Sequence, residues 1–252
     1  MIRSLYNTGM GMLVLQKQQE TVSNNLANVE TPSYKSRELL MEAAFSETLV
    51  NHAQGRRNVL GSLNLGTRVG GLHTDLDQGV LTATGSSLDV ALQGTGFFQI
   101  QTPDGQVLSR NGRFHLSENG VLVDEGNNPV LAIDGTGDLV PVPVESPEGL
   151  SIGADGALTG SDGAAYRLSL VDVTDPGELV SLDDGYFGTG IGNLEPAAGT
   201  VVRQGFYERS NVDVTDGLIR LMNNTAMMGA NGRVLTTLDE TLSRAVNEIG
   251  KL

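Results

Sequence analysis

The stretch Asn211–Leu252 reads NVDVTDGLIRLMNNTAMMGANGRVLTTLDETLSRAVNEIGKL and carries a long helical pattern. Its apolar residues lie on a grid of alternating steps of four and three, the spacing of a seam along one side of a helix, and the remaining positions of the grid are Thr225, Gly232 and Asp239. The seam consists of Val214, Leu218, Leu221, Met228, Leu235, Leu242, Val246 and Ile249. Such a seam needs a partner helix, because it leaves a continuous apolar stripe on the helix surface.

The start of the chain carries a matching pattern. Steps of three and four join Leu5, Thr8, Met12, Leu15, Gln19, Val22, Leu26 and Val29. The two ends are therefore expected to pair as a coiled coil. The N-terminal helix is marginal alone, since each of Gly9 and Gly11 costs about 1 kcal/mol relative to alanine, and we expect it to order only when packed.

Local signals predict the ends of these helices. The first helix is expected to stop near Asn28, because Thr31-Pro32 favours extended backbone and Pro32 cannot donate to a helical ladder. Asp213 is the favoured cap of the C-terminal helix. Between the helices, residues 38–50 are expected to form a short helix, 51–71 an extended or hairpin-like connector, and 67–84 an extended segment.

The middle of the chain changes from helical to alternating periodicity. Short apolar runs between residues 85 and 199 are separated by turn dipeptides that favour positive φ and predict successive hairpins. These are Asp104-Gly105, Asn111-Gly112, Asn119-Gly120, Asp134-Gly135, Asp155-Gly156, Asp162-Gly163 and Asp184-Gly185. Tyr166–Val173 is the best late strand.

The predicted fold class is therefore α+β, with terminal α-helices pairing as a coiled coil and an inserted β-rich domain of hairpins. Residues 1–30 and 211–252 form the terminal helical domain in this prediction. Residues 31–84 and 200–210 form an extended connector region, and residues 85–199 form the β-rich domain.

Composition excludes several classes of function. The chain has 252 residues, no Cys and a formal net charge of −14, which excludes disulfides and thiol chemistry. Residues 1–50 carry 4 basic and 5 acidic side chains, 51–200 carry 6 and 19, and 201–252 carry 6 and 6. An acidic middle repels phosphate backbones, so no nucleic-acid partner is expected. No apolar window is long enough for a membrane span, and Met1–Glu20 lacks the pattern of a cleaved signal peptide.

Motifs for catalysis are missing as well. His52, His73 and His115 are far apart in sequence, and Gly94-Thr-Gly96 opens no phosphate-binding loop. We therefore expect no catalytic residue, no resident metal, no cofactor and no small-molecule substrate. Weak calcium binding at acidic turns such as Asp183-Asp184 stays open.

Two interpretations of the terminal seams remain on periodicity alone. They pack inside one soluble domain, or they join different molecules. Met227-Met228-Gly229 and Gly232 favour assembly, because methionine and glycine give adaptable surfaces and allow close backbone approach. The alternative function is a soluble carbohydrate- or peptidoglycan-binding β module flanked by dimerising helices, which a sugar pulldown with residues 85–200 would detect.

Three segments carry a family resemblance. Asn24-Asn-Leu-Ala-Asn-Val-Glu-Thr-Pro-Ser-Tyr-Lys35 resembles the N-terminal signature of flagellar rod and hook axial proteins, with Ser33 where glycine is usual. The run from Leu88 to Gly105, continued by Ser109-Arg-Asn-Gly-Arg-Phe114, is similar to their central motif. Gln204-Gly-Phe-Tyr-Glu-Arg-Ser-Asn-Val-Asp-Val214 is similar to the segment before their C-terminal helix, with Tyr207 where leucine is usual.

The resemblance implies a structural, non-enzymatic subunit of the flagellar basal-body rod, with the proximal rod favoured over the distal rod. Its partners would be further copies, neighbouring rod and hook subunits and the flagellar type III export apparatus. It would lie in the periplasmic part of the rod, exported without a cleaved signal peptide. The expected subunit interface comprises Leu5, Met12, Leu15, Val22, Asn24, Asn25, Leu26, Asn28, Leu218, Leu221, Met228, Leu235, Leu242 and Val246. The three asparagines are expected to supply side-chain hydrogen bonds where the first helix ends.

Overall fold

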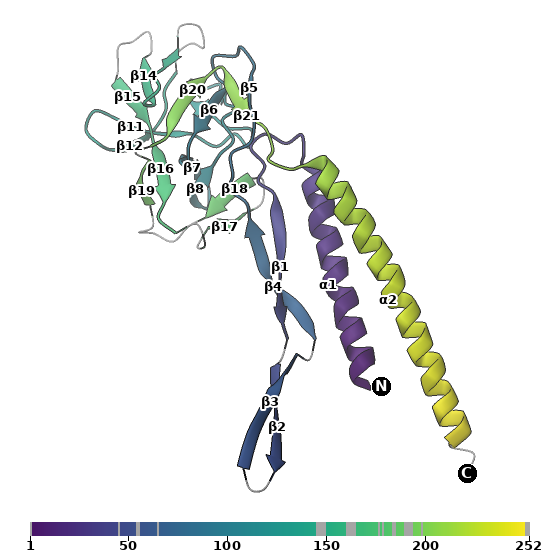
Figure 1. Cartoon of the computed structure of the whole chain (residues 1–252). Helices are drawn as coiled ribbons and strands as arrows, with labels where there is room; N and C mark the ends of the chain where they lie inside the picture. The colour runs from purple at the N-terminus through teal and green to yellow at the C-terminus, as the bar shows by residue number, and fades with distance from the viewer. Residues whose placement is uncertain are drawn as a thin grey trace. The chain divides into compact units, whose positions relative to one another are not determined.

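The computed structural model divides into two compact units, coloured by position along the chain in Figure 1. Unit 1 comprises Met1–Ala27, Arg37–Asp75 and Asp213–Leu252, and unit 2 comprises Asn28–Ser36 and Leu76–Val212. The structure describes residues 2–44, 46–53, 56–64, 66–144, 150–159, 165–175, 177, 179–182, 185–188, 194–197 and 199–249.

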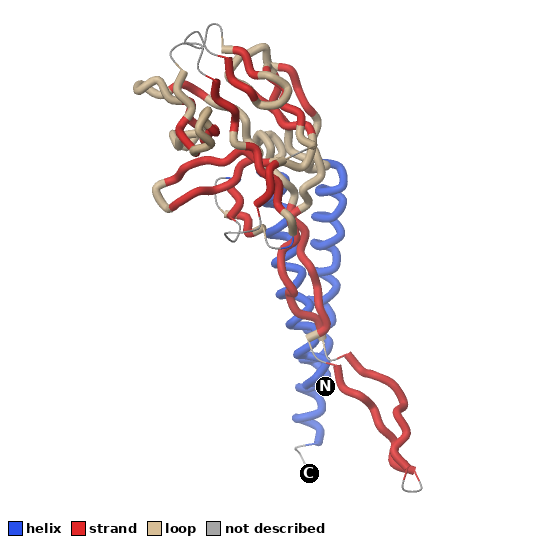
Figure 2. Tube along the Cα trace, turned by 90° about the vertical axis from the view of Figure 1, so that its left-hand side faces the viewer, coloured by secondary structure: helices blue, strands red, loops and turns tan. Residues whose placement is uncertain are grey.

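Two long helices form the main part of unit 1. Helix α1 spans Ile2–Ala27 and helix α2 spans Val214–Ile249. They lie side by side and run in opposite directions, as Figures 1 and 2 show. The predicted pair of terminal helices is therefore present within one chain.

The predicted helix ends are confirmed. Helix α1 ends at Ala27, ahead of the Thr31-Pro32 dipeptide that cannot continue it. Helix α2 begins after Asp213, whose Oδ1 accepts the backbone N–H of Thr215 at 2.7 Å and of Asp216 at 3.2 Å. This is the geometry of an N-cap, which satisfies donors that have no partner inside the helix.

Unit 1 also contains two antiparallel ribbons. Strand β1 (Arg37–Ala43) pairs with β4 (Thr67–Thr74), and β2 (Ser46–Ala53) pairs with β3 (Arg56–Asn64). The short helix predicted for residues 38–50 is wrong, because this segment forms β1 and the start of β2. Pairing across the hairpin supplies the backbone partners that a local helix would have supplied, and Leu39 becomes buried. The extended or hairpin-like connector predicted for 51–71 is confirmed for the described residues, since 51–53, 56–64 and 67–71 lie in strands.

The named strands of unit 2 are short, are joined by turns and loops, and pair in antiparallel fashion. One sheet has the order β17-β18-β8-β7-β16-β19, a second has the order β12-β11-β15-β14-β13, and three strand pairs are β10-β9, β20-β6 and β21-β5. The strands are β5 (Leu81–Ala83), β6 (Val90–Gln93), β7 (Phe97–Thr102), β8 (Gly105–Ser109), β9 (His115–Leu116), β10 (Leu122–Val123), β11 (Leu131–Ile133), β12 (Leu139–Pro141), β13 (Ser151–Ile152), β14 (Ala157–Thr159), β15 (Ala165–Leu168), β16 (Leu170–Val173), β17 (Val180–Ser181), β18 (Tyr186–Gly188), β19 (Leu194–Pro196), β20 (Val201–Gln204) and β21 (Phe206–Glu208).

Two apolar clusters hold unit 2 together. The larger one gathers buried residues from β6, β7, β10, β11, β13, β14, β15 and β20, with the Phe98 and Phe114 rings in edge contact at 5.1 Å between centroids. The smaller one contains Phe97, Leu108, Val173 and Phe187. Strand β7 serves both, because Phe97 and Phe98 point to opposite faces of the sheet.

Most of the predicted turns join paired strands. The dipeptides at 104–105, 119–120, 134–135 and 155–156 lie between β7 and β8, β9 and β10, β11 and β12, and β13 and β14. Asn111-Gly112 is not a hairpin turn, because β8 and β9 do not pair and a methyl group at Gly112 would overlap the carbonyl of Val90. The turns at 162–163 and at Asp184 fall outside the described residues.

The predicted late strand 166–173 is broken at Ser169. Residues up to Leu168 belong to the sheet of β11 and β14, and residues from Leu170 belong to the sheet of β7 and β19. The buried Ser169 hydroxyl donates to Gln99 Oε1 at 2.5 Å. A single run of strand-forming sequence therefore serves two sheets.

Candidate functional site

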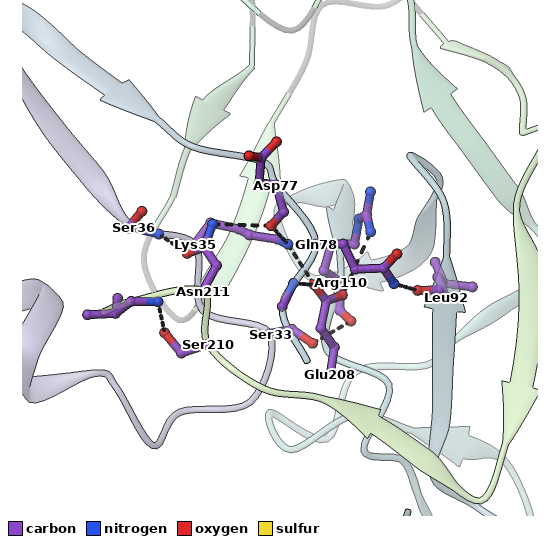
Figure 3. Close-up of polar contacts among 12 residues, drawn as sticks. Ser33, Lys35, Ser36, Asp77, Gln78, Leu92, Arg110, Glu208, Ser210 and Asn211 are labelled. Carbon is purple, nitrogen blue, oxygen red and sulfur yellow. Dashed lines mark hydrogen bonds and ion pairs between the residues drawn. The ribbon is translucent and has the colours of Figure 1, made fainter. Parts of the chain in front are cut away.

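A buried ion cluster lies in unit 2, drawn in Figure 3. Lys35 Nζ lies 2.7 Å from Glu208 Oε1, and both side chains are 1% exposed. Arg110 Nη1 lies 3.7 Å from the other carboxylate oxygen, Oε2. Glu208 Oε1 also accepts the backbone N–H of Gly79 at 2.7 Å, and Lys35 Nζ donates to the carbonyl of Asp77 at 2.8 Å. One carboxylate therefore joins two buried cations.

The three charged residues come from distant parts of the chain, and Ser33 helps to bring them together. Its N–H donates to the carbonyl of Glu208 and its hydroxyl to the carbonyl of Arg110, both at 2.8 Å. Ser33 has a φ of 54°, in the left-handed region that favours glycine. A serine at this position makes the hydroxyl hydrogen bond to Arg110, but it must hold a backbone conformation that is less favourable for serine than for glycine.

The charges of the cluster are buried, so each needs an opposite charge or a hydrogen-bond partner nearby. Burial lowers the pKa of the Arg110 guanidinium, and the carboxylates of Glu208 and Asp172 oppose that shift. The guanidinium stacks over the Phe97 ring at 4.8 Å. Arg110 Nε and Nη1 and Glu208 Oε2 make no hydrogen bond to the described residues. Removing the single carboxylate would leave two buried cations without their main partner.

The two chain crossings that lead out of unit 2 are joined beside this cluster. Ser36 N–H donates to Asn211 Oδ1 at 2.8 Å, and Asn211 N–H donates to the carbonyl of Tyr34 at 3.3 Å. Asn211 Nδ2 also donates to the carbonyl of Asp77 at 3.1 Å. The segments that precede α2 and follow α1 are therefore tied to each other (Figure 3).

In unit 1, Asn25 bridges the end of α1 to the start of β1. Its Nδ2 donates to the carbonyl of Arg37 at 2.8 Å, and its Oδ1 accepts the N–H of Arg37 at 3.0 Å. Asn28 Oδ1, in unit 2, accepts the Thr31 hydroxyl at 3.2 Å. Side-chain hydrogen bonds predicted for these two asparagines are confirmed, and Asn24 lies on the exposed side of α1.

The face of α2 that meets α1 differs from the predicted seam. Half of the predicted positions are half-buried, namely Leu221, Met228, Leu235 and Leu242. Of the other four, Val214, Leu218 and Val246 are 43%, 49% and 67% exposed, and the side chain of Ile249 falls outside the described ones. Asn224 is buried, and Gly217, Asn231 and Leu238 are half-buried, each one residue before a predicted position (218, 225, 232 and 239); of those predicted positions only Gly232 is also half-buried.

This correction has a steric cause. A methyl group at Gly217 would lie 2.9 Å from Leu26 Cδ2, so the missing side chain lets α1 approach closely. A seam assigned from apolar residues alone includes Leu218 and leaves out Gly217, so it misses the side of α2 that meets α1. The seven-residue spacing of Gly217, Asn224 and Asn231 is the sequence pattern that indicates this side.

On α1, the predicted residues fall on faces of different exposure. Val22 is 7% exposed, Met12, Leu15 and Leu26 are half-buried, and Leu5 is 37% exposed. Val14, absent from the predicted seam, is the most buried residue of the helix at 4%. Helix α1 contacts β1 and β4 as well as α2, so its buried surface is wider than one seam.

Among the residues that the structure describes, no group of three or more acidic or histidine side chains is placed to hold a metal ion. None of the described helices is both long and apolar enough to cross a bilayer.

Sequence comparisons place the chain. Residues 5–35 match the family model described as flagella basal body rod protein, 91–160 that of the flagellar hook protein FlgE/F/G D1 domain, and 203–248 that of the flagellar basal body rod FlgEFG protein C-terminal region. The FlgG rod protein of Buchnera aphidicola (subsp. Schizaphis graminum) is 30% identical across 97% of this chain and 98% of the relative. The chain belongs to the flagellar basal-body rod protein family.

Both FlgG and FlgF rod proteins are similar to this chain over nearly their whole length. FlgG of Bacillus subtilis is 28% identical over 98% of this chain and 99% of the relative. FlgF of Caulobacter vibrioides is 27% identical over 100% of both chains. The resemblance drawn from the three signature segments is thereby confirmed, and the chain is a structural subunit of the flagellar rod.

The rod-family signature segments meet at the ion cluster. Lys35 ends the first segment, Arg110 lies in the second and Glu208 in the third. Sequence reasoning quoted all three segments without linking these residues, since pairs 98 and 173 positions apart leave no periodic signal. In this rod protein the segments share one buried contact.

Proposed function

We propose that this rod protein polymerises through unit 1 into the hollow drive shaft of the flagellum. The observation that carries the proposal is the distribution of exposed apolar side chains. Of 21 large hydrophobic residues that the structure leaves exposed among the described residues, 15 lie in unit 1. A surface of this kind is typical of a subunit whose apolar residues are covered by neighbours.

Helix α2 presents much of this surface. Its exposed apolar residues are Val214, Leu218, Ile219, Met222, Met227, Val234 and Val246. They lie on several sides of the helix, beside and opposite the face that meets α1, and a helix that is apolar on several sides is one that is packed on several sides. In the proposal these sides pack against helices of neighbouring subunits, in a wall of coiled coils.

Charge separates the two units in the same way. Unit 1 contains 10 basic and 10 acidic residues, whereas unit 2 contains 6 basic and 20 acidic residues. Their formal net charges are therefore 0 and −14. Apolar association meets little electrostatic opposition in the neutral unit, and the charged unit favours solubility.

Several finer points belong to the same proposal. We place the subunit in the proximal rod, on the length of the chain and the Ser181–Phe187 segment, although relatives of both names match to a similar degree. The subunit would be exported by the flagellar type III apparatus without a cleaved signal, and stand in the periplasmic rod. The proposal also includes the predicted division into three parts. These are a terminal helical domain (1–30 and 211–252), an extended connector (31–84 and 200–210) and an inserted β-rich domain (85–199).

The proposal is tested with Leu218→Asp, introduced into the native gene. Leu218 is 49% exposed, so the charge leaves the fold of the single chain intact but prevents burial against a neighbour. We expect loss of swimming with unchanged circular dichroism. Asn223→Asp, at an exposed polar position of the same helix, is the control and retains swimming.

Two outcomes bear on the details. Leu26→Asp and Leu235→Asp, on the α1–α2 face, are also expected to abolish swimming while unit 2 stays folded. Normal motility of Leu218→Asp would refute assembly through these sides of α2. Electron microscopy of basal bodies with a labelled copy decides between the proximal and distal rod.

A further inference from the structure

Asn224 is a polar residue in the middle of the α1–α2 contact. It is 4% exposed, and its Nδ2 has no hydrogen-bond partner among the described residues. Its neighbours along the same face, Leu221 and Met228, are apolar. A buried amide donor without an acceptor is unfavourable, and a leucine at this position would avoid that penalty.

The level of Asn224 on α1 follows from two contacts on either side. Leu26 lies beside Gly217, and Gly11 lies beside Asn231. Position 224 is midway between 217 and 231, and the midpoint of 26 and 11 falls between Gln18 and Gln19. Both glutamines are half-buried. A polar layer therefore crosses the helix pair at this level.

The apolar layers alone only partly define how the helices align. In the observed register Leu221 is level with Val22, and Met228 is level with Leu15. If α1 slid by one heptad in one direction, Leu221 would meet Leu15 and Met228 would meet Thr8; in the other direction Met228 would meet Val22 and Leu221 would lie beyond the end of α1 at Ala27. Each shift therefore keeps one of the two apolar contacts, so the apolar layers distinguish the registers by a single contact.

The polar layer distinguishes these registers. A slide in one direction brings Asn224 level with Gly11 and Met12, and a slide in the other brings it level with Asn25 and Leu26. The amide of Asn25 is already bonded to Arg37. Only the observed register sets Asn224 beside two long amide side chains.

We propose that Asn224, with Gln18 and Gln19, sets the register of the helix pair and lowers its stability in doing so. The inference rests on the proposed function, since register matters most where many copies must present the same surface. A polar residue inside a helical seam selects one alignment at a cost in stability. Asn224 is thus a positioning residue for assembly.

The test uses Asn224→Leu in the full chain, with Asn223→Leu as the control. Asn223 is the exposed neighbour on α2, so its substitution adds the same apolar group outside the contact. Amide hydrogen exchange of α1 and α2 measures the stability of the pair. Swimming of a strain that carries only the variant measures assembly.

We expect Asn224→Leu to slow amide exchange in the pair by about tenfold, as removal of one unsatisfied buried donor would do, and yet to reduce swimming. Asn224→Gln, which keeps the amide, is expected to swim. A purely structural asparagine would instead change stability and swimming in the same direction.

Two results would overturn the inference alone: full swimming of Asn224→Leu, or faster exchange in its helices than in the unsubstituted chain. If Leu218→Asp swims normally, the failure lies with the proposed assembly, and the inference falls with it.

Discussion

Lys35 Nζ and Glu208 Oε1 lie 2.7 Å apart, although the two residues are 173 positions apart in the sequence. The chain passes between the units four times, and each residue belongs to one of the two crossings that lead out of unit 2, after residue 36 and after residue 212. Since the pair is 1% exposed on both sides, it forms only when unit 2 closes around it. This contact ties the two crossings together in the folded subunit.

Glu208→Gln is expected to destabilise unit 2 by about 3–5 kcal/mol, because it leaves the buried Lys35 and Arg110 without a counter-charge. Denaturant unfolding followed by circular dichroism measures the loss. The matched control is Glu42→Gln, which breaks the exposed pair with Arg68 and is expected to cost about 0–1 kcal/mol. Equal effects of the two variants would contradict the role of burial.

Two substitutions of Ser33 distinguish the effect of its backbone strain from the effect of its hydrogen bond. Ser33→Ala loses the hydroxyl that donates to Arg110 and keeps the left-handed backbone, whereas Ser33→Gly loses the hydroxyl and relieves the backbone. Alanine is therefore expected to cost more stability than glycine, by about 1 kcal/mol. Thermal unfolding of both variants ranks them, and the reverse order would show that strain at this turn is negligible.

Asn25→Ala removes two hydrogen bonds to the backbone of Arg37. We expect a loss of about 1–3 kcal/mol at the junction of α1 and β1, since the peptide groups that it satisfies are partly shielded from water. Hydrogen exchange of the Arg37 amide reports this locally. Ser23→Ala, an exposed position on the same helix, should leave that amide unaffected.

The carboxyl group of Asp134 is expected to make the stability of unit 2 depend on pH in the acid range. The Thr136 hydroxyl, followed by the N–H groups of Asp138 and Thr136, lowers the pKa of the Asp134 carboxyl below its ordinary value of 3.8. Its contribution to stability is present above the pKa of the unfolded chain and is lost as the pH falls through the lower folded value. Asp134→Asn is therefore expected to flatten the decline of unit 2 stability below pH 3.8. A decline as steep as that of the unsubstituted chain would contradict this.

Tertiary contacts explain where prediction from sequence failed. Residues 38–50 contain good helix formers, yet they form strands because β1 pairs with β4 and buries Leu39. Three of the predicted seam positions of α2 are exposed, and at one of them the cause is visible: Gly217, a poor seam residue by hydropathy, lets Leu26 of α1 approach closely in place of Leu218. Local sequence patterns do not show which strand or helix a segment will pack against.

Local sequence patterns were enough to predict the two terminal helices, the cap at Asp213, most turns of the β-rich part and the rod family, because periodicity, capping and signature residues are local. Long-range contacts determine which side of α2 meets α1, where the chain forms the ribbons of unit 1, and how Lys35, Arg110 and Glu208 meet. Those features depend on burial and charge pairing between residues far apart in the chain, and their free energy exists only once the partners are in contact.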